Sequence, residues 1–203
     1  SNPKTPSEVL AKLANIEDTK VRDALASNPN TPGEALVKLF YSESLYPQTY
    51  IVANIVSNPN MPVEILAKLA NDQNENIRRH VAYNSKTQPE TLKKLAYDEN
   101  LVVRKHVAQH PNTSVETLTK LANDNELGIR AAIAGNPNTP VEVLAKLAEE
   151  KRLAIKDRLL SNPSTPLNIL IKFIEDKNQD FSNLKTQEEV LAILANSKDN
   201  DII

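Results

Sequence analysis

Residues 136–148 read Asn-Pro-Asn-Thr-Pro-Val-Glu-Val-Leu-Ala-Lys-Leu-Ala, and versions of this phrase return along almost the whole chain. Its first step, Asn-Pro or a variant differing by one residue, begins at Asn2, Asn28, Asn58, Asn84, His110, Asn136 and Asn162. Successive intervals are 26, 30, 26, 26, 26 and 26 residues. A fixed period of this size is typical of a solenoid, in which one small supersecondary unit stacks on copies of itself.

The first half of each repeat is predicted to be an amphipathic helix with its own start signal. In one copy Thr139 would be the N-cap, Pro140 the first helical residue and Glu142 the third, which together form a capping box. Leucines and alanines at helical spacing follow and define a core face. Lysines stand in a column on the outer side, at positions 12, 38, 68, 94, 120, 146 and 172. Six of these seven follow a glutamate by four residues, so we expect Glu–Lys pairs within each helix rather than a ladder for phosphate or acidic ligands.

The second half of each repeat is predicted to be a shorter helix, exemplified by Val103-Arg104-x-x-Val107. Its length allows two turns of either α- or 3₁₀-helix. An acid stands six residues before the arginine in the central copies, as Asp98 does before Arg104. This offset favours an ion pair from loop to helix within one repeat, and a row of arginines that binds nucleic acid is the alternative.

The repeat as a whole, Asn-Pro-Asn-Thr-Pro-x-Glu-x-Leu-x-Lys-Leu-Ala-x-Asp followed by Val-Arg-x-x-Val-Ala, resembles the leucine-rich repeat variant family, which is similar in style to HEAT-like helical repeats. The resemblance runs from residue 2 to about 175. It implies an all-α, right-handed superhelix of about seven two-helix repeats with no sheet. It brings no settled activity and no catalytic residues.

Composition restricts the function classes. The formal net charge is -2, so no overall basic field attracts nucleic acid or an anionic membrane. The chain has no cysteine, which excludes disulfides and thiol chemistry and favours a cytoplasmic location. We expect no cofactor. No stretch has the length of a membrane span. The chain opens inside a repeat, so we expect it to be part of a longer polypeptide.

Catalytic motifs are not visible either. There are three glycines and no glycine-rich phosphate loop. HEAT-like folds do include DNA glycosylases and bilin lyases, so an enzyme or a nucleic-acid-binding module remains the alternative function by fold analogy. The absence of tryptophan and the low aromatic content of 4% count against both.

Function on a solenoid is expected where the copies differ, because equivalent positions are needed for stacking. The second repeat carries four extra residues and an aromatic-rich stretch at about 41–50. Tyr46 and Tyr50 would anchor a partner from this insertion. The alternative is an insertion that packs its aromatic side chains onto the flank of the solenoid.

The third and fourth repeats place larger polar side chains where neighbouring copies have small or acidic ones. We call this set the central patch; it consists of Arg79, His80, Tyr83, Lys105, His106 and Gln109. On the concave face it would be a local basic surface that suits an acidic peptide or a phosphate group, with an ordinary solvated face as the alternative. His80, His106 and His110 invite a zinc hypothesis, but His110 stands where other copies have asparagine and should point away from His106. We therefore expect no metal.

The C-terminal part departs from the repeat. A capped helix is expected at about 187–195, folding across the open end of the stack, and a frayed tail at 196–203. The sequence thus predicts one solenoid domain over residues 1–195. Its expected function is a non-catalytic scaffold that binds a protein or peptide partner through its concave face.

Overall fold

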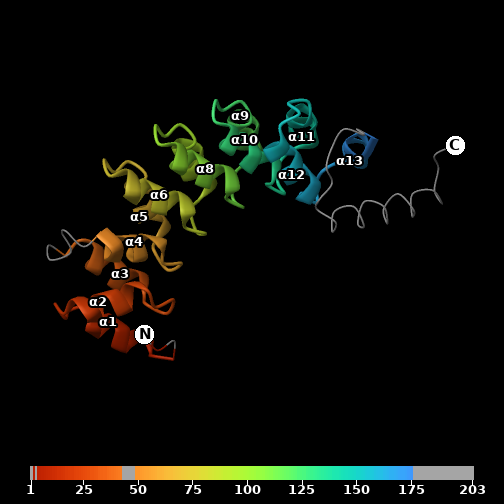
Figure 1. The fold of residues 1–203 in the computed structure, drawn as a ribbon. Helices are drawn as coiled ribbons and strands as arrows, with labels where there is room; N and C mark the ends of the chain where they lie inside the picture. Colours follow the sequence, from red (N-terminus) through yellow and green to blue (C-terminus); the bar gives the residue numbers. More distant parts are fainter. Residues whose placement is uncertain (1, 3, 43–48, 176–203) are drawn as a thin grey trace.

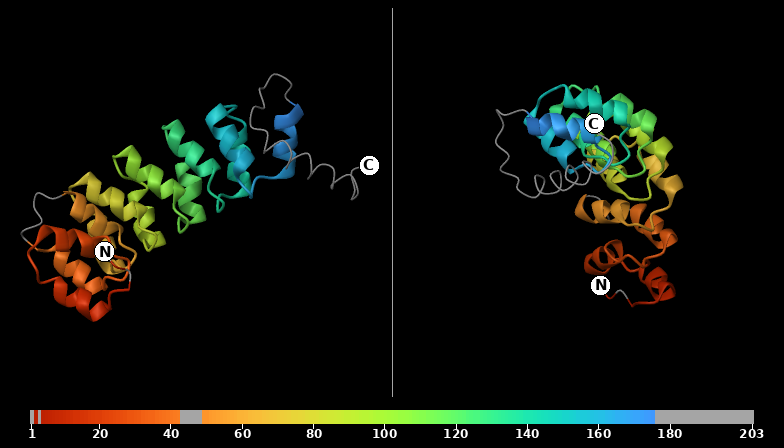
Figure 2. Two further views of the ribbon diagram at one scale, coloured as in Figure 1. Left: turned by 60° about the horizontal axis from the view of Figure 1, so that its bottom comes forward. Right: turned by 90° about the vertical axis from the view of Figure 1, so that its right-hand side faces the viewer.

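The structure is a computed structural model, and it describes residues 2, 4–42 and 49–175. The helix expected at 187–195, the tail at 196–203 and Tyr46 lie outside these residues. The described part consists of α-helices joined by short loops and contains no strand. Figures 1 and 2 show an elongated, curved stack of helix pairs, as the sequence predicts.

Six complete helix pairs and one further helix make up the described stack. The odd-numbered helices open the repeats: α1 (Ser7–Leu13), α3 (Gly33–Phe40), α5 (Val63–Leu69), α7 (Pro89–Leu95), α9 (Val115–Leu121), α11 (Val141–Ala148) and α13 (Leu167–Glu175). The even-numbered helices close them: α2 (Thr19–Ala26), α4 (Thr49–Ser57), α6 (Glu75–Tyr83), α8 (Leu101–Gln109), α10 (Leu127–Ala134) and α12 (Leu153–Ser161). The second helices are α-helices, whereas the sequence allowed either α- or 3₁₀-helices. The expectation that they are the shorter ones is wrong, because α6 and α8 have 9 residues and α5 and α7 have 7.

The core runs between the two rows of helices as a continuous apolar layer. Leu118 and Leu121 of α9 and Val103 and Val107 of α8 belong to this layer, and all four are almost completely buried. Equivalent leucines and β-branched residues repeat this arrangement along the stack. Helices this short would not persist alone, so their stability comes from burial against neighbouring repeats.

The threonine of the Thr-Pro step does not cap the helix that follows it, so the predicted capping box is wrong. Thr139 Oγ1 donates to the carbonyl of Ile133 at 2.7 Å. The N-cap of α11 is Pro140, whose side chain has no atom that can accept a hydrogen bond. A turn closed by Thr139 N–H and the Asn136 carbonyl brings the hydroxyl back over the end of α10. Thr31, Thr87, Thr113 and Thr165 repeat the contact. The threonines therefore satisfy carbonyls at the C-terminal ends of the even-numbered helices.

The first asparagine of the repeated phrase forms a buried ladder that ties each repeat to the one before it. Asn136 Nδ2 donates to the carbonyls of Ala108 at 2.8 Å and His110 at 3.3 Å, and its Oδ1 accepts from Asn138 N–H at 3.0 Å. Three other asparagines make the same contacts, at Asn58, Asn84 and Asn162. From the sequence alone this asparagine only marked where each repeat begins, and its cross-repeat bonds were missed.

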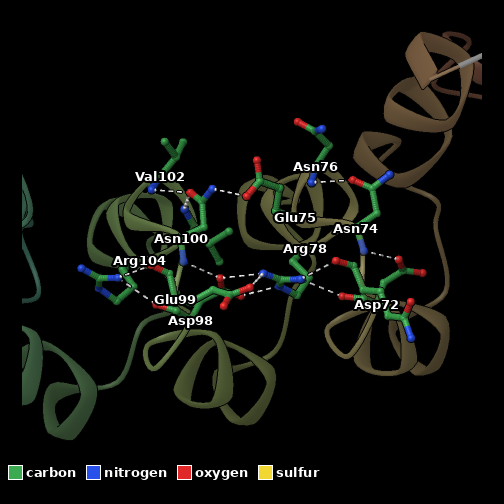
Figure 3. A network of polar contacts seen from close by, with 12 residues as sticks. Asp72, Asn74, Glu75, Asn76, Arg78, Asp98, Glu99, Asn100, Val102 and Arg104 are labelled. Atoms are coloured by element: carbon green, nitrogen blue, oxygen red, sulfur yellow. Dashed lines mark hydrogen bonds and ion pairs between the residues drawn. The ribbon is translucent and has the colours of Figure 1, made fainter.

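Arginines of the even-numbered helices form a second ladder, shown in Figure 3. Arg104 Nη1 donates to the carbonyls of Asp98 at 2.8 Å and Glu99 at 3.1 Å in its own repeat. Its Nε contacts the Asp124 carboxylate at 2.7 Å, in the next repeat. Arg78 with Asp98 and Arg130 with Glu150 follow the same rule. The predicted ion pair within one repeat is wrong, because the loop of the same repeat offers the arginine its carbonyl groups and the carboxylate belongs to the following loop.

The lysine column also makes contacts across repeats rather than within helices. Lys120 Nζ lies 3.4 Å from the centre of the Tyr97 ring, and Lys146 donates to Asn123. Among the described residues, no column lysine forms an ion pair with the glutamate four residues earlier, so that prediction is wrong. Each of these contacts joins a lysine to the loop after the corresponding helix of the preceding repeat, which the extended lysine side chain can reach.

Candidate partner-binding surface

The even-numbered helices line the inner side of the curved stack. They pack directly against one another from α2 to α12, whereas contacts between successive odd-numbered helices are few. The more closely spaced row of a curved stack lies on its inner side, and Figure 1 shows the stack bent into an arc. The exposed face of the even-numbered helices is therefore the concave face of the solenoid.

The central patch lies on this concave face, on α6 and α8. Tyr83, Lys105 and Gln109 are exposed, and Arg79, His80 and His106 are partly buried. The equivalent positions are Ala131 and Ala132 on α10 with its C-cap residue Gly135, and Ala53, Asn54 and Ser57 on α4. The structure thus brings the predicted patch residues onto two adjacent helices, bordered on both sides by smaller, uncharged residues.

Arg79 is held in place by a chain of hydrogen bonds that starts in the preceding repeat. Its Nη2 lies 3.3 Å from His80 Nε2, and His80 Nδ1 lies 2.9 Å from Ser57 Oγ. A guanidinium can only donate, so His80 Nε2 must offer its lone pair. The proton of the neutral ring therefore sits on Nδ1 and is donated to Ser57. Sequence reasoning missed Ser57, although it stands at the position that Tyr83 occupies one repeat later.

His106 makes the corresponding contact with Tyr83. The two rings meet edge to face, with centroids 5.6 Å apart. Burial lowers the pKa of His106, and the charges of Arg79 and Lys105 lower it further. Burial likewise lowers the pKa of His80, together with Arg79 and His106. Both imidazoles are therefore kept neutral by partial burial in a positively charged setting.

The two cations of the central patch have no acidic partner. Within the described residues neither Arg79 nor Lys105 lies within ion-pair distance of a carboxylate. Arg78, Arg104 and Arg130, on the same row of helices, are each paired with one. The patch is therefore a local concentration of uncompensated positive charge on a chain whose formal net charge is -2.

Tyr50 lies near the start of α4 and is 54% exposed. It is three residues before Ala53 and seven before Ser57, so it shares the concave face of that helix with them. The structure thus places Tyr50 on the same face as the central patch, one helix away from α6. The extra residues of the second repeat fall between α3 and α4, and Tyr41 at their start is exposed.

His110 does not join the other two histidines. Its Nε2 lies 2.9 Å from the Asn84 carbonyl, and its Nδ1 accepts from Asn112 N–H at 3.0 Å. It therefore takes the place of asparagine in the buried ladder, and the prediction that it points away from His106 is confirmed. The described residues include no group of three or more His, Cys, Asp or Glu side chains that could hold a metal ion.

His110→Asn is expected to make the protein less sensitive to acid. Burial lowers the pKa of His110, with the Asn84 carbonyl opposing this in part, so the folded state binds fewer protons than the unfolded state. Stability is then lost as pH falls through the unfolded-state value of about 6.5. Asparagine restores the ordinary ladder, so unfolding free energy at pH 7.5 should change by less than about 1 kcal/mol.

Urea unfolding at pH 7.5 and pH 5.5 measures this difference in sensitivity. The variant should lose less stability between the two pH values than the parent chain. His80 and His106 remain in both proteins and act as an internal control for the rest of the pH dependence. Equal losses in the two proteins would contradict the assignment.

Comparison with known proteins supports the architecture. Residues 101–126, a stretch of one repeat length that spans α8 and α9, match the family model described as "Leucine rich repeat variant". A solved structure titled "A leucine-rich repeat variant with a novel repetitive protein structural motif" matches with a TM-score of 0.57 and 22% sequence identity. The match covers 90% of this chain and 71% of the other. Among curated proteins none matches.

The helices of the described part are all too short or too polar to cross a bilayer.

Proposed function

The chain is built of repeats of the leucine-rich repeat variant type, and from this premise we propose that it is a non-catalytic scaffold that binds an acidic segment of a partner protein on its concave face. The observation that carries the proposal is the pair of uncompensated cations, Arg79 and Lys105, on neighbouring helices of that face. Charge complementarity of this kind selects partners and speeds their encounter.

Three ring-bearing side chains, Tyr50, Tyr83 and His106, add apolar contact area to the charged concave surface. Tyr83 is 63% exposed beside His106, and Tyr50 is exposed one helix away. Tyrosine and arginine are the residue types that most often dominate the energy of a protein interface. The proposed partner segment therefore combines acidic residues with at least one apolar side chain that packs on a tyrosine.

Reversing both charges, with Arg79→Glu and Lys105→Glu, is expected to weaken partner binding by at least about tenfold, because two attractions become two repulsions of up to about 1 kcal/mol each. The probe is the set of peptides selected by the full chain from a random phage-displayed library, and these should be enriched in aspartate and glutamate. The melting temperature should change little, since neither side chain has a carboxylate partner to lose.

Lys68→Glu with Lys94→Glu is the matched control, because it makes the same change in net charge on the exposed outer lysine column. An equal loss of affinity in this control would contradict the assignment of binding to the central patch. Selected peptides that lack acidic residues would contradict it as well. Tighter binding of a DNA or RNA duplex, with a steep dependence on salt, would favour a nucleic-acid-binding module instead.

A further inference from the structure

The guanidinium of Arg79 is oriented in advance, yet most of its donors have no partner. Its bond to His80 Nε2 is its one hydrogen bond within the described residues, and that ring is in turn held by Ser57. A neutral imidazole accepts a hydrogen bond without cancelling the charge. The remaining N–H groups of the fork therefore stay available to a ligand that presents several acceptor oxygens.

The surroundings of Arg79 contain positive charge and neutral groups, and no acid that pairs with it. Glu75, one helical turn earlier on α6, accepts from Asn100 Nδ2 at 2.8 Å instead. Arg79 and Lys105 both act on His106, which places two cations around one ring. The concave positions of α4 and α10 on either side are neutral, namely Ala53, Asn54, Ser57, Ala131, Ala132 and Gly135. The acids at equivalent positions are Asp23 on α2 and Asp157 on α12, each two repeats away from the nearer helix of the patch.

A phosphomonoester fits this arrangement better than a carboxylate does. At pH 7 it carries a charge of about -1.5 to -2 and three strong acceptor oxygens, whereas a carboxylate carries one charge and two oxygens. Two cations, one of them a partly open guanidinium fork, match the larger charge and the larger number of acceptors. We propose that the central patch binds a phosphorylated serine or threonine side chain of the partner, with Arg79 and Lys105 contacting the phosphate and His80 positioning Arg79.

This inference rests on the proposed function and narrows its ligand class. A bound phosphate should change the pKa values of two histidines more than a peptide with only carboxylates would. The pKa values of His80 and His106 are lowered by burial and by neighbouring positive charge. A bound dianion offsets the repulsion from Arg79 and Lys105, so phosphate binding should raise both pKa values and take up protons.

The test uses the full chain and three short glycine–alanine peptides that differ at one central residue, which is phosphoserine, glutamate or serine. Amide NMR titration should show shifts confined to α6, α8 and the adjoining part of α4. The phosphoserine peptide should bind at least about tenfold more tightly than the glutamate peptide, and the serine peptide should not bind measurably. Ring proton signals of His80 and His106 should titrate at higher pH when the phosphoserine peptide is bound.

Variants separate the contacting residues from the positioning residue. Arg79→Gln should weaken phosphoserine binding by at least about tenfold, and Lys94→Gln on the outer face is the control with the same change in charge. Ser57→Ala should weaken phosphoserine binding less than Arg79→Gln does, because it removes only the hydrogen bond that holds the His80 ring. It should also change the pH at which His80 titrates. Ser27→Ala, at the equivalent position just after α2, should leave both readouts unchanged.

Equal affinity for the phosphoserine and glutamate peptides would overturn the phosphate proposal and leave the acidic partner of the proposed function intact. Shifts away from α6 and α8, or phosphoserine binding that survives Arg79→Gln, would also overturn it. A different outcome would contradict the proposed function alone. In it, phosphoserine would bind at the patch, but the affinity of the selected library peptides would be the same for the parent chain and for the variant with Arg79→Glu and Lys105→Glu.

Discussion

Asn136→Ala is expected to lower the free energy of unfolding by about 2–4 kcal/mol. The residue is 2% exposed, and its side chain makes three hydrogen bonds, two to the carbonyls of Ala108 and His110 and one from Asn138 N–H. Alanine leaves the buried Ala108 carbonyl without a partner, which costs about 1–3 kcal/mol. It also removes one hydrogen bond from the His110 carbonyl, which keeps the Thr113 N–H, and one from the Asn138 N–H, at about 1 kcal/mol each. Urea unfolding followed by far-UV circular dichroism measures the loss.

The way the variant unfolds should change as well as its stability. A solenoid repeat contacts only its neighbours, so a weakened interface between the repeats that begin at His110 and Asn136 uncouples the two ends of the stack. We expect a broader transition with a smaller denaturant dependence, or two transitions.

Asn138→Ala is the control for this prediction. Asn138 Nδ2 donates to the Pro111 carbonyl at 2.7 Å, but the residue is exposed and water can replace the bond. Its loss should therefore cost less than about 1 kcal/mol. If both substitutions destabilise the protein equally, the buried ladder is not the main tie between repeats.

Arg104→Met is expected to lower the free energy of unfolding by about 2–3 kcal/mol. It removes the ion pair to Asp124 and the bonds to the carbonyls of Asp98 and Glu99. The Asp124 side chain is 10% exposed, so its carboxylate is left largely buried without its cation. Breaking a fully buried pair costs about 3–5 kcal/mol, and the partial exposure of Arg104 reduces that figure.

The pH dependence of this loss follows from Asp124. Burial by itself raises the pKa of Asp124. The hydrogen bonds from Arg104 and from Glu126 N–H, together with the charges of Arg104 and Arg130, outweigh burial and hold the pKa below its usual value. A lowered carboxyl pKa contributes stability above the unfolded-state value of about 3.9, and that contribution is lost as pH falls further. The gap between the parent chain and Arg104→Met should thus be full at pH 7 and shrink towards pH 3.

Two further variants check this prediction. A double-mutant cycle with Asp124→Asn should give a coupling free energy between positions 104 and 124. Lys93→Met breaks an exposed cross-repeat pair with Glu116, whose atoms are 3.0 Å apart, and should cause no measurable loss of stability. A loss at Lys93 as large as that at Arg104 would show that burial is not what gives the arginine ladder its energy.

The predicted and observed structures agree in the features that depend on local periodicity. Leucines such as Leu118 and Leu121 lie on the core face that helical spacing predicts, and the repeat boundaries follow the Asn-Pro steps. The central patch was also predictable, because aligning the copies shows where Arg79 and Lys105 replace small or acidic residues. The contact of Ser57 with His80 was not, since it depends on how far one helix is displaced along the next.

Apart from the length of the second helices, the errors concern bonds between repeats. Thr139 was assigned to the helix after it, Arg104 to an acid of its own repeat and the column lysines to glutamates of their own helix. Each assignment chose a partner close in sequence, as rules based on spacing must. Observed partners of Arg104 and Asn136, the Asp124 carboxylate and the His110 carbonyl, lie 20 and 26 residues away in a neighbouring repeat.

The amino-acid sequence by itself therefore determined the repeat, its helices, its core face and the position of the central patch. These depend on interactions between residues three to four apart, and the sequence displays that spacing directly. Only the tertiary structure decided which polar groups meet, which helix row faces inward and why Arg79 keeps its charge uncompensated. Those features depend on the displacement and rotation between stacked repeats, which arise from packing along the whole core and have no local signature.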